Sequence, residues 1–145
     1  MSKFLLPSTI DQVREFQAKF CPDQNSNHPA LAPYRTALLR SHFIAEELGE
    51  LIEAMAAGDL VEILDALIDL QYFLDGTFLA YGLDGVKELA FAEVHRSNMA
   101  KLGPDGEPIL NAAGRVVKPE GWEPPELALV LGDYISQYWR PDDNV

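Results

Sequence analysis

The sequence contains a single cysteine and few basic residues, and these shortages exclude several kinds of protein. Because Cys21 has no second cysteine to pair with, no disulfide can form within the chain, which fits a reducing cytoplasm. The 145 residues include only 11 Lys and Arg against 23 Asp and Glu, a formal net charge of −12. Such a chain is poorly suited to nonspecific binding of nucleic acid or of an anionic membrane surface. We therefore expect a cytoplasmic protein that binds neither.

Long uninterrupted hydrophobic runs are also missing. The longest apolar region contains Glu62, Asp65, Asp69 and Asp75, so it does not have the pattern of a transmembrane helix. The hydrophobic fraction, 48%, is ordinary for a soluble globular protein, and the length suits one domain with its own core. We therefore expect a single helical domain over residues 1–145.

Capping residues and the spacing of apolar residues predict an all-α fold. Ser8 or Thr9 can cap a first helix, Gly58 can end the second, and Asp59 can begin the third. The expected helices cover, in order, about residues 9–20, 34–57, 59–82, 83–102 and 126–139. We expect these four or five helices to form an antiparallel bundle.

The expected domain has three parts. Its catalytic core covers about residues 34–102, a Gly/Pro-rich tail covers 103–125, and a C-terminal helix covers about 126–139. Within the tail, residues 109–110 and 116–117 flank NAAGR and can pair as a small hairpin, an appendage to the bundle.

The second and third helices differ in how their apolar residues are distributed. On the second, an apolar stripe lies opposite most of the acidic residues, and consists of Leu48, Leu51, Ile52 and Met55. The third is apolar almost all round, a pattern typical of a buried central helix. We therefore expect the third helix at the centre of the bundle.

Two acidic clusters face each other across the short connector AAGD. The second helix carries one and the third carries the other; their members are Glu46, Glu47, Glu50 and Glu53, and Glu62, Asp65 and Asp69. An acidic helix stripe is commonly a solvated face, and this interpretation suits Glu53 best. However, Asp65 and Asp69 lie within an apolar helix, where carboxylates are costly unless something compensates their charge.

A bound divalent cation is the simplest compensation for converging carboxylates. Carboxylate ligands with no Cys or His nearby in sequence suit Mg²⁺, with Mn²⁺ as a second choice, rather than Zn²⁺. Mg²⁺ uses few protein carboxylates and leaves positions for water and substrate phosphates. The pattern therefore predicts a magnesium site for phosphate-ester or phosphoanhydride chemistry.

The motif Glu46-Glu47-Leu48-Gly49-Glu50 resembles the EExxE element of the MazG-like, all-α nucleoside triphosphate pyrophosphohydrolases, relatives of dimeric dUTPases. The segments DLQYFLDGTFLAYGLD, AFAEVHRSNMAKLGPDGEPI and VVKPEGWEPPEL resemble the second metal helix, the next helix and the tail of a phosphoribosyl-ATP pyrophosphohydrolase-like branch. The resemblance covers about residues 40–127. It implies Glu46, Glu47 and Glu50 as catalytic residues, with Glu46 orienting or deprotonating the attacking water.

One departure from the family pattern affects the expected metal ligands. The second element of the family is usually ExxD, and with Asp69 as its aspartate the glutamate position holds Ala66. Asp65 can replace it, or residues 62–65 can themselves form the ExxD. The expected ligands are therefore Glu47, Glu50, Asp65 and Asp69, with Glu62 as a further candidate.

The resemblance also implies residues that contact substrate. Asn98 and Lys101 match family positions that contact the nucleoside and the phosphates, and Arg96 either reaches a phosphate or forms a surface ion pair. Trp122 either covers a base or packs the tail onto the core.

The expected function is Mg²⁺-dependent hydrolysis of a (deoxy)nucleoside triphosphate to the monophosphate and pyrophosphate. dUTP and other noncanonical nucleotides are candidate substrates. One alternative is a phosphoribosyl-ATP pyrophosphohydrolase, and another is a non-catalytic, metal-stabilised helical module. The resemblance further implies a homodimer or homotetramer, which suits the very apolar third helix.

Overall fold

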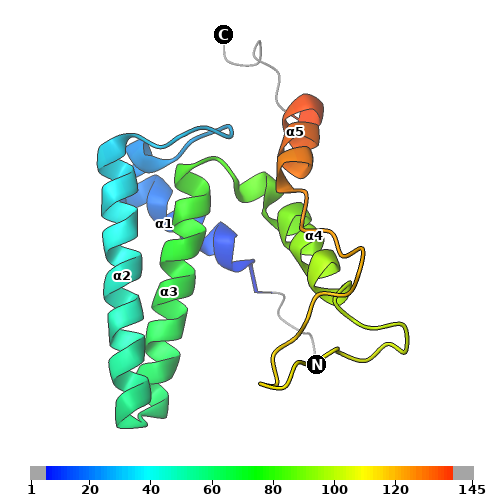
Figure 1. The fold of residues 1–145 in the computed structure, drawn as a ribbon. Helices are drawn as coiled ribbons and strands as arrows, with labels where there is room; N and C mark the ends of the chain where they lie inside the picture. Colours follow the sequence, from blue (N-terminus) through cyan, green and yellow to red (C-terminus); the bar gives the residue numbers. More distant parts are fainter. Residues whose placement is uncertain (1–5, 139–145) are drawn as a thin grey trace, which may run out of the picture. The chain divides into compact units, whose positions relative to one another are not determined.

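The computed structural model describes residues 6–138 and confirms the all-α fold. Figure 1 shows the helices of this part of the chain: α1 (Thr9–Phe20), α2 (Tyr34–Ala57), α3 (Leu60–Ala80), α4 (Lys87–Met99) and α5 (Leu127–Tyr138). Two short 3₁₀ turns, Pro22–Gln24 and Asp84–Val86, separate some of them. Residue 139, the expected end of the last helix, lies outside the described residues.

The chain forms two compact units, Met1–Asp84 and Gly85–Val145. The first contains α1, α2 and α3, and the second contains α4, the Gly/Pro-rich tail and α5. The single domain over residues 1–145 stays a prediction.

The first three helices begin and end where local chemistry favours it. The Ser8 side chain accepts a hydrogen bond from the Asp11 N–H, as a helix N-cap does. At the end of α2, Gly58 adopts a left-handed conformation (φ 69°), and the Asp59 N–H donates to the Ala54 carbonyl at 3.1 Å. Asp59 then caps α3 by accepting from the Val61 and Glu62 N–H groups. These caps reverse the chain and make α2 and α3 an antiparallel hairpin (Figure 1).

The C-terminal half of α3 is closed by α1, α2 and the loop between them. Phe43 of α2 stacks on Phe73 of α3 at 4.8 Å between ring centroids, and Phe16 of α1 meets Tyr72 edge-on at 5.7 Å. Residues 26–30 also lie against the end of α3, because the Ser26 N–H donates to the Leu79 carbonyl. This end of the hairpin contains most of the buried residues of α3.

A buried polar network crosses the same end. Arg40 is only 6% exposed, and its Nη2 donates a hydrogen bond to the side-chain oxygen of Gln24 at 2.9 Å. The Gln17 amide, 2% exposed, also lies against the guanidinium, with its oxygen 3.0 Å from Nη1 and its nitrogen against Asn25. Burial lowers the pKa of Arg40. Because a Cβ at Gly76 would lie 2.6 Å from the Gln17 amide and 2.7 Å from Arg40 Nη1, any larger residue there would force this buried network to shift.

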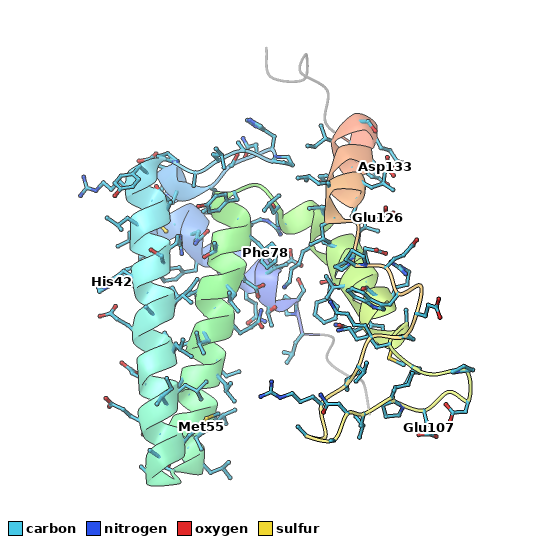
Figure 2. All side chains as sticks on the ribbon, viewed as in Figure 1. His42, Met55, Phe78, Glu107, Glu126 and Asp133 are labelled. Carbon is cyan, nitrogen blue, oxygen red and sulfur yellow. The ribbon has the colours of Figure 1, made fainter. Side chains whose placement is uncertain are left out.

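The connector end of the hairpin corrects the expectation that α3 is a buried central helix. Ala66 is buried, but Leu60, Val61, Leu64, Leu67 and Ile68 are 46–78% exposed. The apolar stripe of α2 is exposed too: only Leu51 is buried, while Leu48, Ile52 and Met55 are 48–60% exposed. Figure 2 shows Met55 near this end. The reason is that α1 packs only against the other end of α3. At the connector end α2 and α3 are alone, and two helices cannot enclose an apolar surface between them.

In the second unit, α4 packs against α5. α4 begins later and ends earlier than expected for 83–102, because residues 84–86 form a 3₁₀ turn and Leu102 forms an antiparallel bridge with Pro108. Figure 2 shows Glu126 at the start of α5 and Asp133 further along it. The Glu126 N–H donates to Glu93 Oε1 at 3.0 Å, which joins the start of α5 to α4.

The predicted hairpin in the tail is confirmed in a minimal form. Leu110 and Val116 form an antiparallel bridge, and the Val117 N–H donates to the Ile109 carbonyl at 2.7 Å. Asn111 closes the turn through its backbone and its side chain, which accepts from Ala113 and Arg115 N–H groups. Across residues 6–138, no helix is both long enough and apolar enough to cross a membrane.

Candidate active site

The α2–α3 hairpin carries all the predicted metal ligands. Glu46, Glu47 and Glu50 lie on α2, and Asp65 and Asp69 lie on α3, which runs antiparallel beside it. Glu47 and Asp69 are half-buried, whereas Glu46, Glu50 and Asp65 are exposed. Because the connector is short, residues that precede it on α2 face residues that follow it on α3.

Glu47 is the electrostatic centre of this group. Its Oε2 atom is buried and has no hydrogen-bond partner among the described residues. Burial raises the pKa of Glu47, and the negative charges of Glu50, Asp69, Glu46 and Asp65 raise it further. The structure therefore brings together carboxylates from both helices, and an unsatisfied oxygen lies among them.

A groove of about 430 Å³ opens beside these residues, toward the connector. Carboxylates from both helices line it, together with two alanines: Glu50, Glu53, Ala54, Ala57, Asp59, Glu62 and Asp65. Glu62 therefore neighbours Glu50 and Asp65, but it is not among the charges that raise the pKa of Glu47.

The carboxylates do not form a ready-made metal cage. Within residues 6–138, no three side chains of the His, Cys, Asp and Glu types converge closely enough to hold a metal ion. The oxygen-only donor set suits Mg²⁺ or Mn²⁺, as does the unsatisfied Oε2 of Glu47. The ligand set itself stays a prediction.

Glu46, the candidate for orienting or deprotonating water, has a histidine beside it. His42 Nε2 lies 3.5 Å from Glu46 Oε2, one helical turn earlier on α2. Both side chains are exposed, so water can reach the Glu46 carboxylate.

The predicted substrate-binding residues lie at the end of α4. Lys101 Nζ donates to Asn98 Oδ1 at 2.8 Å, so these two polar groups are adjacent as expected. Arg96 instead forms a two-pronged ion pair with Glu93, through Nε and Nη2 at 2.7 Å each. This ion pair and the Glu126 N–H lower the pKa of Glu93 to about 2. Of the two roles considered for Arg96, the structure therefore shows the ion pair.

The sequence did not indicate the places that Glu53 and Arg40 take in the structure. Glu53, interpreted as part of a solvated face, lines the groove with Glu50, and their spacing of three residues was the available signal. Arg40 gave no signal, because an arginine in an amphipathic helix is most often exposed. Of the two roles expected for Trp122, the structure shows packing of the tail, here onto α4, since its Nε1 donates to the Ser97 carbonyl at 2.8 Å.

A family model described as phosphoribosyl-ATP pyrophosphohydrolase matches residues 13–98, more than half of the chain. No curated protein matches it. A crystal structure from Exiguobacterium sp. 255-15 is described provisionally as an NTP pyrophosphohydrolase. Its sequence is 29% identical to this chain and its TM-score is 0.48, and the match covers 90% of this chain and 96% of that one. On the family match, the chain belongs to the phosphoribosyl-ATP pyrophosphohydrolase family of the MazG-like superfamily, and it is a hydrolase that acts on nucleotide anhydrides.

Proposed function

We propose that this protein hydrolyses a (deoxy)nucleoside triphosphate to the monophosphate and pyrophosphate in the presence of Mg²⁺, with Mn²⁺ as a substitute. Family membership supports hydrolysis of a nucleotide anhydride. The observation that carries the metal dependence is the buried Oε2 of Glu47, which lacks a partner among the described residues while four carboxylates raise the pKa of its side chain. A cation is the simplest group that satisfies this oxygen and offsets those charges.

In this proposal the metal ligands come from both helices of the hairpin: Glu47, Glu50, Asp65 and Asp69, with Glu62 as a further candidate. When bound, Mg²⁺ would neutralise charge that develops on the phosphates and lower the pKa of bound water. Asp65 suits the ligand position better than Glu62, since Asp65 contributes to the raised pKa of Glu47 and Glu62 does not.

The remaining residues orient the reactants. Glu46 accepts the proton of the attacking water on its exposed carboxylate, the water oxygen forms a bond to phosphorus, and the anhydride bond between the α- and β-phosphates breaks. The products are a nucleoside monophosphate and pyrophosphate. Lys101 provides positive charge for the phosphates, and Asn98 offers an amide to the nucleoside.

dUTP or another noncanonical nucleotide is our first candidate substrate, because the chain resembles relatives of dimeric dUTPases. The second candidate is phosphoribosyl-ATP, which the description of the matching family model favours. We place the reaction in the cytoplasm, where a chain with a single cysteine needs no disulfide.

The test is a pyrophosphate-release assay on dUTP, the four standard dNTPs and phosphoribosyl-ATP, each with Mg²⁺, Mn²⁺ or EDTA. We expect release from at least one dNTP with Mg²⁺ and none in EDTA. Release from phosphoribosyl-ATP alone would select the second candidate. Folded protein that releases pyrophosphate from none of them, or that works equally well in EDTA, would contradict the proposal.

We also propose that the protein is a homodimer or homotetramer in which a second copy covers the connector end of the hairpin. The exposed apolar residues there lie on both helices, and Leu60, Val61 and Ile52 are 60–78% exposed. A contiguous apolar surface of this kind is typical of an interface. A second copy of the same hairpin offers the same apolar face, as a two-fold symmetric interface requires.

A further inference from the structure

The end of the tail is fixed to α4 by two hydrogen bonds around one residue. Trp122 Nε1 donates to the Ser97 carbonyl at 2.8 Å, and Ser97 Oγ donates to the Glu123 carbonyl at 3.0 Å. Ser97 is only 1% exposed, so the Ser97 end of both bonds is shielded from water. The indole ring is therefore held in a defined position on the second unit.

Two lysine ammonium groups lie against this ring. Lys118 Nζ is 4.0 Å from the ring centroid of Trp122, and Lys101 Nζ is 5.6 Å from it. Lys101 comes from the end of α4 and Lys118 from the returning tail, so the fold brings them together from 17 positions apart in sequence. Both distances fall within the range of a cation–π contact, which helps to fix where an ammonium group sits.

Neither ammonium group forms an ion pair with a carboxylate in residues 6–138, although the chain has twice as many acidic as basic residues. Lys101 has one polar partner, the Asn98 side-chain oxygen, and each ammonium carries three donors. Two like charges at one ring repel each other, and an anion between them would remove that repulsion. Trp122, Lys101 and Lys118 therefore form a small basic surface with unused donors.

We propose that this surface is a polyphosphate-binding site and that Lys118 is a second phosphate-binding residue beside Lys101. A compact, multiply charged anion suits it, because lysine binds phosphate as a point charge and two such charges lie at one ring. Lys118 and Trp122 lie beyond residues 13–98, the part that the family model matches. That the natural occupant is the phosphate chain of a nucleotide rests on the proposed function.

The experiment uses Trp122 as its own reporter. The chain has two tryptophans, so Trp139→Phe leaves Trp122 as the only one. Inorganic tripolyphosphate is titrated into this variant in EDTA while the indole emission is recorded. We expect a saturable change in emission, because an anion that draws the ammonium groups toward itself alters the surroundings of the ring. Lys118→Gln in the same background should weaken binding about three- to fivefold.

Arg115→Gln is the matched control, because it removes one positive charge from an exposed position of the same tail. We expect it to bind tripolyphosphate as the Trp139→Phe parent does. Equal weakening by Arg115→Gln and Lys118→Gln would show a general charge effect and overturn the proposal. So would equal affinities of Lys118→Gln and the parent, or no saturable change in the parent.

The titration contains no metal and involves no hydrolysis, so its result does not depend on whether the proposed function is correct. Saturable, Lys118-dependent binding without hydrolysis of any nucleotide would leave this site standing and reject the proposed activity. Hydrolysis of a dNTP by a protein that does not bind tripolyphosphate would support the proposed activity and reject this site. Far-ultraviolet circular dichroism of each variant checks that the helices are intact, as expected for the exposed Lys118.

Discussion

At the end of the α2–α3 hairpin nearest α1, stacked rings and the buried Arg40 network fill the interior. At the connector end, leucine, isoleucine and valine side chains lie exposed beside carboxylates that repel one another. The two ends belong to the same pair of helices but differ in what surrounds them. The closed end supplies its own partners within the chain, whereas the connector end has the features of a surface completed by a cation and a second copy. We therefore propose that the closed end mainly stabilises the hairpin and that the connector end holds the site.

The largest expected effect of a substitution is at the connector end. Glu50→Gln should lower kcat by about a hundredfold or more, because it removes a proposed metal ligand while keeping the size of the side chain. Its thermal stability in EDTA should be equal or higher, since one of the charges near Glu47 is gone. The measurement is pyrophosphate release alongside a thermal melt.

Glu53→Gln is the matched control, since Glu53 lines the same groove one turn further along α2. It should keep most of the activity. If Glu53→Gln lost turnover and Glu50→Gln kept it, Glu53 would be the metal ligand in place of Glu50, and our assignment would be wrong.

The next prediction concerns the exposed apolar surface. Leu64 is 61% exposed on α3 at the connector end, so Leu64→Glu would place a charge inside the proposed interface between copies. We expect light scattering after size-exclusion chromatography to show an oligomer for the wild-type protein and a smaller species for this variant. Leu31→Glu, at a loop position that is 92% exposed, should keep the wild-type mass. A monomeric wild-type protein would contradict the proposed assembly.

At the closed end, the effect should be on stability. Gly76→Ala should reduce the free energy of unfolding by about 1–3 kcal/mol, because its Cβ would collide with Gln17 and Arg40. Gly49→Ala is the control in an open position of α2, with no atom within 4 Å of the added carbon, and should stabilise by about 0.5–1 kcal/mol. Urea denaturation measures both. A Gly76→Ala variant as stable as Gly49→Ala would show that the polar network gives way easily.

The helix boundaries could be predicted because their causes are local. Ser8, Gly58 and Asp59 act on backbone groups within a few residues, so the sequence contains the whole interaction. α4 was less well predicted because its ends depend on the 3₁₀ turn at 84–86 and on the bridge between Leu102 and Pro108.

Features that depend on distant partners could not be predicted in the same way. The apolar pattern of α3 predicts a helix, but it does not predict which segments pack against that helix. In the structure α1 covers only one end of it. Arg40 is buried because Gln17 and Gln24, from two other segments, meet its guanidinium. The acidic residues of the candidate site were found because they sit at helical spacing near one turn. Packing was one of the two roles expected for Trp122, but its partner, the Ser97 carbonyl 25 positions away, could not be named from the sequence.

We propose that the carboxylates around Glu47 strain the fold unless a cation lies among them. Burial and neighbouring charges raise the pKa of Glu47 in the folded state. Protonated Glu47 therefore favours folding at a pH below its unfolded-state pKa. This contribution to stability is lost as the pH rises through the folded-state pKa. In EDTA, acidification from about pH 7 to about pH 5 should therefore stabilise the wild-type protein more than Glu47→Gln.

The most direct measurement is the Tm at pH 7 of the wild-type protein and of Glu47→Gln, each in EDTA and in excess Mg²⁺. A ligand that binds only the folded state raises its stability, so Mg²⁺ should raise the wild-type Tm by about 4 °C or more. Glu47→Gln should melt higher than the wild-type protein in EDTA and gain little from Mg²⁺. A wild-type Tm that Mg²⁺ leaves unchanged, or a Glu47→Gln variant that gains as much as the wild-type protein, would contradict the claim.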